Sequence, residues 1–140
     1  MRRFMTRSIV AIVILVLAGS AYVRLAPTDP DRWHRMPGGI TNRDLEGGAM
    51  RIVGAGKDGL ARLDAIIRAT PRTTVLAGSV GTGMITYVTR SALMGFPDYT
   101  TVRHAPPQIE IYGRLRFGRS DLGVNAARID RWLERFRQGG

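Results

Sequence analysis

The residues that could carry chemistry gather in the stretch FGRSDLGVNAARIDRW, which runs from Phe117 to Trp132. Two glycines, a serine, an aspartate and an asparagine follow an alternating strand pattern and precede a helical pattern. A strand, a polar glycine turn and a helix form the framework of many catalytic sites and phosphate sites. The first question is therefore whether this turn holds a nucleophile, an anion or neither.

The sequence GRSDLG differs by one position from the nucleophile elbow G-x-S-x-G. That motif places glycine two residues after the serine, because the turn leaves no room for a side chain there. Here Leu122 holds that place and Gly123 follows it. A hydrolase using Ser120 with His104, completed by Asp98, is our alternative interpretation, and it requires these side chains to meet.

Structural roles account for most residues of the turn. Gly118 and Gly123 permit backbone angles that other residues resist. The carboxylate of Asp121 can accept hydrogen bonds from the amides just ahead of it, as in an Asx turn. Asn125 directly precedes the helical pattern, so we expect its side chain to form the N-cap.

The other residues of the turn lead to two separate expectations. We expect Leu122 and Val124 to pack the turn against the core. Arg119 and Ser120 have no structural role in this scheme. Because helix N-termini attract anions, an anion held beside Arg119 is a secondary hypothesis.

A second group of candidate residues lies on the preceding strand, QIEIYGRLRF. Alternation places Tyr112, Arg114 and Arg116 on one face and the apolar side chains on the other. Arg90 and Arg103 would join them if the neighbouring hairpins are in register. Guanidinium groups suit carboxylates and phosphates, so this face predicts binding of an anionic ligand such as a lipid head group or an envelope polymer. The competing interpretation is a solvated face balanced by neighbouring acids.

Several classes of site are excluded or disfavoured by composition. The chain has no cysteine, which excludes disulfides, thiolate metal sites and cysteine nucleophiles. The two histidines, His34 and His104, are far apart in sequence, and no carboxylate pair has ligand spacing, so we expect no metal. The G-x-G-x-x-G match at Gly54–Gly59 lacks the acidic residue that a dinucleotide site needs, so we expect no cofactor.

The N-terminus indicates where the protein lies. Three arginines at positions 2, 3 and 7 precede an uncharged, mostly apolar run from Ser8 to Val23. This run is intermediate in length between a signal peptide and a spanning helix, and we prefer an uncleaved anchor. The basic flank places the N-terminus in the cytoplasm. We therefore expect a single-pass protein of the inner membrane whose C-terminal domain faces the periplasm.

The elements follow from hydrophobic periodicity. The segment KDGLARLDAIIRAT predicts a helix, and a stripe of Ile129, Trp132, Leu133 and Phe136 predicts another near the C-terminus. Between them, RTTVLAGS, MITYVTRSALM, YTTVRH and QIEIYGRLRF are typical of strands. We predict an α+β fold in the order α-β-β-β-β-α. It is a two-layer sandwich in which both helices cover one face of a four-stranded, mainly antiparallel sheet.

We divide the 140 residues into three parts. Residues 1–24 form the membrane anchor or signal segment, and residues 51–140 form the small α+β domain. Residues 25–50, rich in proline and glycine, form an extended connector. We expect Trp33 to dock this connector on the domain, rather than to lie at the bilayer interface.

The segment RLRFGRSDLGVNAARI resembles the signature of the bacterial and plastid family called domain of unknown function 1499. That signature reads R-S-x-S-R-x-G-x-S-D-L-G-V-N-x-x-R-I and follows a phenylalanine–x–aspartate turn, which here is Phe96-Pro97-Asp98. The opening LAPTDPDRWH is similar to that of membrane-anchored proteobacterial members. This chain departs from the pattern at Gly113 and Leu115, where the family tends to have serine. The resemblance implies no reaction and no catalytic residue.

Together these features predict a membrane-anchored domain outside the cytoplasm. We expect a binding or envelope-associated module rather than an enzyme, with the bilayer and an anionic lipid or envelope component as partners. The net charge of +10 also suits nucleic acid. However, the basic residues of the exported part are scattered among acids, as in ARIDRWLERFR, so we expect no nucleic acid.

Overall fold

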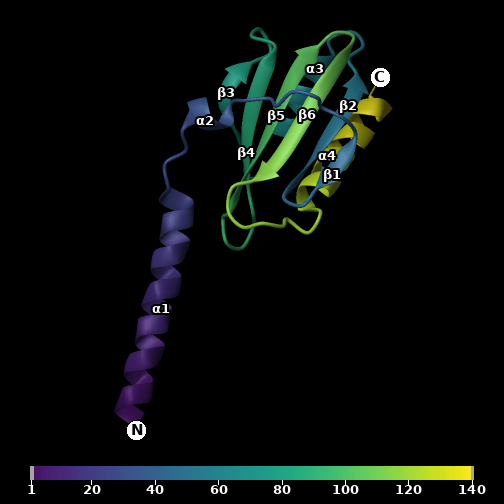
Figure 1. Cartoon of the computed structure of the whole chain (residues 1–140). Coiled ribbons are helices and arrows are strands. Elements are labelled where there is room, and N and C mark those ends of the chain that lie inside the picture. The colour runs from purple at the N-terminus through teal and green to yellow at the C-terminus, as the bar shows by residue number, and fades with distance from the viewer. Residues whose placement is uncertain (1, 140) are drawn as a thin grey trace.

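The computed structural model describes residues 2–139 and shows a layered domain beside a long N-terminal helix (Figure 1). The helices are α1 (Arg2–Leu25), α2 (Pro30–Trp33), α3 (Gly59–Arg68) and α4 (Val124–Gln138). The strands are β1 (Arg43–Leu45), β2 (Gly48–Gly54), β3 (Thr73–Ser79), β4 (Met84–Arg90), β5 (Pro97–Ala105) and β6 (Gln108–Leu115). They pair antiparallel in one sheet of order β1-β2-β6-β5-β4-β3. The α+β class and the antiparallel pairing are therefore confirmed.

The sheet has six strands within residues 2–139, so the prediction of four strands is wrong. The additional strands, β1 and β2, precede α3 and include residues that we assigned to the connector. β1 has only three residues and β2 begins at Gly48, so neither shows the alternation of a half-buried strand. The pairing of β2 with β6 requires glycine at position 48. A Cβ there would lie 2.1 Å from the carbonyl oxygen of Gly113.

Both α3 and α4 cover the same face of the sheet, as the apolar stripes predicted (Figure 1). Leu63 and Ile67 of α3 and Ile129 of α4 are fully buried in one core with Ile109 and Ile111 of β6. Complete burial of such a side chain contributes about 1.5–3 kcal/mol. This apolar layer therefore fixes the two helices on the sheet.

The opposite face of the sheet is partly covered by residues 26–37, which we call the strap. Trp33 of the strap stacks on Tyr99 of β5, with ring centroids 4.1 Å apart. Nδ1 of His34 lies within hydrogen-bond distance, 2.9 Å, of the Thr86 hydroxyl on β4. Trp33 therefore docks on the domain, as we expected.

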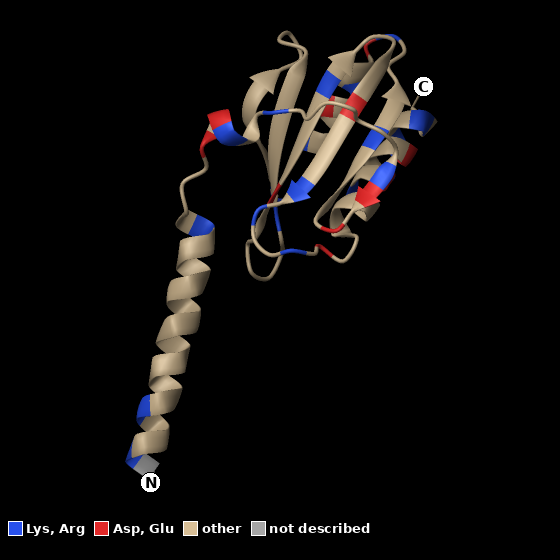
Figure 2. Cartoon of the chain, viewed as in Figure 1, with Lys and Arg blue, Asp and Glu red and all other residues tan. Residues whose placement is uncertain are grey.

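The helix α1 projects away from the sheet (Figure 1). Its span Arg3–Leu25 has a mean hydropathy of 2.2 in its most apolar window, and none of that window is buried in the protein. In the described part of α1, charged residues occur only near the two ends (Figure 2). The helix is therefore long and apolar enough to cross a membrane.

Candidate functional site

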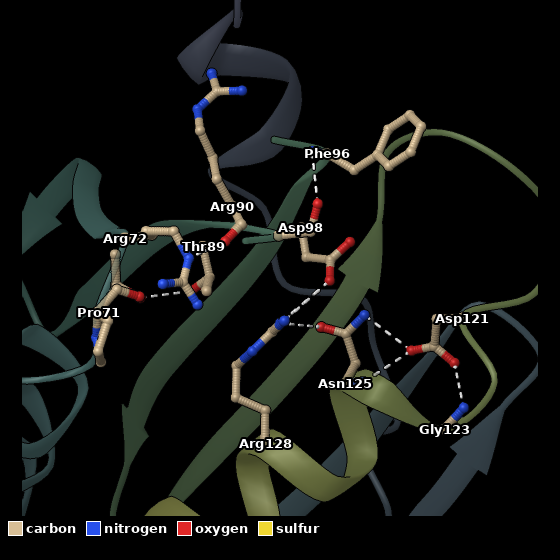
Figure 3. Close-up of polar contacts among 12 residues, drawn as sticks. Pro71, Arg72, Thr89, Arg90, Phe96, Asp98, Asp121, Gly123, Asn125 and Arg128 are labelled. Carbon is tan, nitrogen blue, oxygen red and sulfur yellow. Dashed lines mark hydrogen bonds and ion pairs between the residues drawn. The ribbon is translucent and has the colours of Figure 1, made fainter. Parts of the chain in front are cut away.

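A chain of buried and partly buried polar side chains connects the start of β5 to the start of α4 (Figure 3). The guanidinium of Arg128 lies 3.2 Å from Oδ2 of Asp98 and donates to Oδ1 of Asn125 at 3.0 Å. Nδ2 of Asn125 in turn donates to Oδ2 of Asp121 at 2.8 Å. These four residues come from FPD, SDLGVN and the following arginine, the segments that carry the family resemblance. The structure therefore brings the separated parts of the signature into one network.

Asp121 organises the turn before α4. Its carboxylate accepts hydrogen bonds from the amide of Gly123 at 2.9 Å and from the amide of Asn125 at 3.0 Å. The first of these bonds is an Asx turn. The N-cap residue is Gly123, so our assignment of Asn125 as the N-cap is wrong. The side chain of Asn125 is fully buried and links Asp121 to Arg128 instead.

The apolar residues of this turn do not pack against the core. Leu122 is 93 % exposed and Val124 is 49 % exposed, so the expectation that they pack the turn is wrong. Leu122 has a φ of 52°, in the left-handed region, and Gly123 follows it with a φ of 79°. This backbone leaves the Leu122 side chain outside the protein.

A cavity of about 340 Å³ lies beside the polar network, between α4 and the adjoining ends of β3 and β4. Five arginines line it: Arg72, Arg90, Arg128, Arg131 and Arg135. The other described residues of the lining are Thr70, Pro71, Thr89, Ser91, Val124 and Trp132. The described lining includes no carboxylate, although Arg128 is paired with Asp98 next to it, so the cavity has an excess of positive charge. We call it the arginine cavity.

Helix α4 supplies three of these arginines through its periodicity. Arg128, Arg131 and Arg135 are spaced by three and four residues, which places them along one side of the helix. Arg128 is paired with Asp98. In contrast, the side chains of Arg131 and Arg135 are exposed and form no ion pair or hydrogen bond with residues 2–139. Two guanidinium groups at the edge of the cavity are therefore available to a ligand.

The other side of the cavity is held together by hydrogen bonds between Arg72, just before β3, and Arg90, the last residue of β4 (Figure 3). The amide of Arg90 donates to the carbonyl of Arg72 at 2.9 Å, and Nε of Arg72 donates to the carbonyl of Arg90 at 3.1 Å. Arg72 has a φ of 57°, a left-handed conformation that is uncommon for a residue with a side chain. These contacts fix the backbone of both residues beside the cavity. The guanidinium of Arg90 points away from Arg128 and donates to the carbonyl of Gly95 at 2.9 Å (Figure 3).

Burial affects the charge of Asp98. Loss of solvent around this carboxyl raises its pKa, although the nearby guanidinium of Arg128 acts in the opposite direction. The side chains of Arg128 and Asp98 are only 10 % and 16 % exposed, which explains why desolvation is the larger effect. The ion pair beneath the cavity is therefore formed at a cost in desolvation.

The arginines that we predicted on the second sheet face are largely used by the strap. Arg114 is 9 % exposed; it donates to the Thr101 hydroxyl at 2.8 Å and also to the carbonyl of Trp33. Its burial lowers the pKa of Arg114 to about 10. Arg116 donates to the carbonyl of Pro27 at 2.9 Å.

The alternation of β6 is as predicted, and Tyr112 lies on the same face as Arg114, with the guanidinium carbon 4.7 Å from the centroid of its ring. A groove of about 460 Å³ beside them is also lined by Arg32 and Arg35 of the strap. Arg103, from β5, is paired with Glu110. Arg119 is exposed in the turn after β6. The predicted set of Tyr112, Arg114, Arg116 and Arg119 is therefore not gathered around one cavity.

The structure does not bring the proposed hydrolase residues together. His104 pairs with Ile109 at the hairpin end of β6, whereas Ser120 follows the other end of that strand, which finishes at Leu115. Six strand positions at about 3.3 Å each separate these ends by roughly 20 Å. Asp98 lies at the Leu115 end and pairs with Arg128. In residues 2–139 no group of three potential ligands from His, Cys, Asp and Glu could hold a metal ion.

Sequence reasoning missed the arginine cavity. We interpreted ARIDRWLERFR as a solvated helix face, although the spacing of Arg128, Arg131 and Arg135 beside the apolar stripe marks one edge of that helix. No signal of this kind points to Arg72 and Arg90, because only the packing of β3 and β4 next to α4 brings them to the same cavity.

Comparisons with known proteins agree with the signature. No curated protein and no solved structure matches this chain. A family model, described as "Protein of unknown function (DUF1499)", matches residues 26–136. This match includes the strap, all six strands, α3, the polar network and most of α4. The chain therefore belongs to the DUF1499 family of proteins of unknown function.

Proposed function

We propose that this protein is a membrane-anchored binding module that holds an anionic group, a phosphate or a carboxylate, in the arginine cavity. The observation that carries the proposal is the lining of that cavity, to which five arginines contribute without a carboxylate among the described lining residues. Of these, Arg131 and Arg135 have guanidinium groups without a partner in the described chain. Planar guanidinium groups donate pairs of hydrogen bonds to such anions. The proposal keeps the anionic ligand that the sequence suggested and assigns it to different arginines.

The charges at the cavity edge support this proposal. Arg131 and Arg135 are four residues apart on α4, and like charges at this spacing destabilise a helix by roughly 0.2–0.5 kcal/mol. Within the described chain, neither guanidinium has an acidic partner. A bound anion would remove this repulsion and accept the unused hydrogen bonds.

The chemistry of the lining favours binding over turnover. Ser91 and Thr89 supply hydroxyl groups, but no imidazole, thiol or carboxylate is among the described lining residues to activate them. We therefore propose a receptor or envelope-associated role.

The N-terminal arginines and the apolar helix α1 support a location in the inner membrane. Three arginines precede the apolar run, and by the positive-inside rule this end stays in the cytoplasm. The domain after α1 would then face the periplasm, where anionic lipids and envelope polymers supply phosphate and carboxylate groups.

The test is titration of the full-length chain, in zwitterionic detergent micelles, with inorganic phosphate and pyrophosphate by calorimetry. Arg131→Ala and Arg135→Ala should each weaken binding by at least about tenfold, because a hydrogen bond to a charged group contributes roughly 1.5–3 kcal/mol. Arg137→Ala is the matched control, since it removes the same charge from an exposed residue of α4 outside the cavity lining. Equal loss in all three variants would show that only overall charge matters, and the cavity proposal would be wrong.

A further inference from the structure

Two loops at one end of the sheet expose large apolar side chains. They are residues 91–96, between β4 and β5, and residues 117–123, between β6 and α4, and both lie at the same end of the domain (Figure 1). Leu93 is 82 % exposed and Leu122 is 93 % exposed, and Met94 and Phe96 are also exposed. We call these two segments the paired loops.

The paired loops contact the last turn of α1. Nη2 of Arg24 donates to the carbonyl of Leu93 at 3.2 Å. The ring of Tyr22 lies edge-on to the ring of Phe117, with centroids 6.3 Å apart. Both loops are therefore level with the end of the helix that carries the apolar run.

The sequence of α1 indicates where its C-terminal end, next to the paired loops, would lie relative to a bilayer. The uncharged run ends at Val23, and Arg24 is the first charged residue after it. Tyrosine and arginine at the end of a spanning helix are typical of the lipid head-group region. Arg24 contacts Leu93 and Tyr22 contacts Phe117, so the paired loops lie at the level that head groups would occupy around a spanning α1.

The conformation of Leu122 points to the same environment. A leucine with a φ of 52° has an unfavourable backbone conformation, because its Cβ approaches the following carbonyl oxygen. In water, the exposed side chain of Leu122 makes no contact that offsets this cost. In lipid, burial of the same side chain is favourable and can offset it.

We propose that the paired loops insert Leu93 and Leu122 into the outer leaflet of the bilayer that α1 spans, with Arg24 and Arg119 against lipid phosphates. The inference rests on the membrane anchoring proposed above. A second groove of about 460 Å³ adjoins the arginine cavity at Arg72 and Arg90 and is lined also by Arg24. Docking of the loops therefore holds one side of the arginine cavity close to the head groups.

The absence of cysteine from the chain allows a direct test. Single variants Leu93→Cys and Leu122→Cys are labelled with a nitroxide, in the full-length protein reconstituted into vesicles of phosphatidylcholine and phosphatidylglycerol. The accessibility of each nitroxide to oxygen and to a water-soluble nickel complex is measured. The ratio of the two accessibilities gives the depth of the label in the bilayer. Gly81→Cys, in the β3–β4 turn at the other end of the sheet, is the aqueous control (Figure 1). Leu15→Cys, in the middle of α1, is the control for spanning.

We expect the labels at positions 93 and 122 about 5–10 Å below the phosphates, as for other interfacial elements. If the labels at positions 93 and 122 are as accessible to nickel as the label at position 81, docking of the loops is wrong. The anchor still stands in that case, provided that the label at position 15 is deep in lipid. Shielding from both reagents would indicate a protein contact and would also overturn docking. A water-exposed label at position 15 would disprove the anchor and the docking together, whereas phosphate binding is measured separately in micelles.

Discussion

The guanidinium of Arg128 and the carboxylate of Asp98 form a nearly buried ion pair, with 3.2 Å between nitrogen and oxygen. It connects the first turns of α4 to the start of β5, immediately beneath the arginine cavity. Arg128 is thus both a structural residue and part of the lining. This relationship leads to the first two predictions.

Removal of one partner should destabilise the domain strongly. Arg128→Ala leaves Asp98 buried without its cation, and loss of one member of a buried pair costs about 3–5 kcal/mol. The measurement is thermal and denaturant unfolding of the full chain in micelles. Arg137→Ala, an exposed arginine on the same helix, should change stability by less than about 0.5 kcal/mol. Similar unfolding midpoints for the two variants would contradict a stabilising role for the pair.

The raised pKa of Asp98 predicts how stability depends on pH. Between the ordinary pKa of 3.8 and the higher value in the folded protein, the folded state binds more protons at this residue than the unfolded state. Stability contributed by Asp98 should therefore fall as pH rises through that range. Asp98→Asn should remove this component, and unfolding midpoints of both proteins across the acidic range would show it. If the stability of the parent and of the variant depends on pH in the same way, the raised pKa of Asp98 is refuted.

Thr100 offers a stabilising substitution. Its hydroxyl oxygen is the one buried side-chain polar atom in residues 2–139 without a hydrogen-bond partner. Thr100→Val should raise the free energy of unfolding by about 1 kcal/mol, because it replaces an unsatisfied hydroxyl with a methyl group. The neighbouring Thr101 is the control, since its hydroxyl accepts from Arg114 at 2.8 Å and Thr101→Val should destabilise the protein. Destabilisation by both substitutions would argue against the Thr100 prediction.

Trp33 should hold the strap on the sheet. Trp33→Ala removes the ring that stacks on Tyr99. We expect the free energy of local opening of the strap to fall by about 1–3 kcal/mol. Trypsin reports this directly, because Arg32 and Arg35 of the strap are exposed and local opening frees the adjoining peptide bonds for cleavage. Met36→Ala, another substitution in the strap, should leave the cleavage rate close to that of the parent. An unchanged rate in Trp33→Ala would mean that other contacts hold the strap.

Much of the fold was predictable because it depends on local periodicity. Alternation along β6 correctly placed Ile109 and Ile111 on the helix-covered face and Arg114 on the other. The apolar stripe of α4 likewise identified the side that packs in the core. The strands β1 and β2 were missed, since three residues and a glycine-rich start give too little alternation to detect.

Local sequence patterns were sufficient to predict an apolar N-terminal helix, the α+β class and the buried side of each main element, because these features follow from neighbouring residues. Which arginines share a cavity and which are covered depends instead on how distant segments pack. Arg114 lies on the predicted face, but it binds the carbonyl of Trp33, a residue 81 positions away. Arg72 meets α4 only because β3 and β4 end beside that helix. Such contacts depend on the order in which distant segments pair and pack, and a local pattern carries no information about that order.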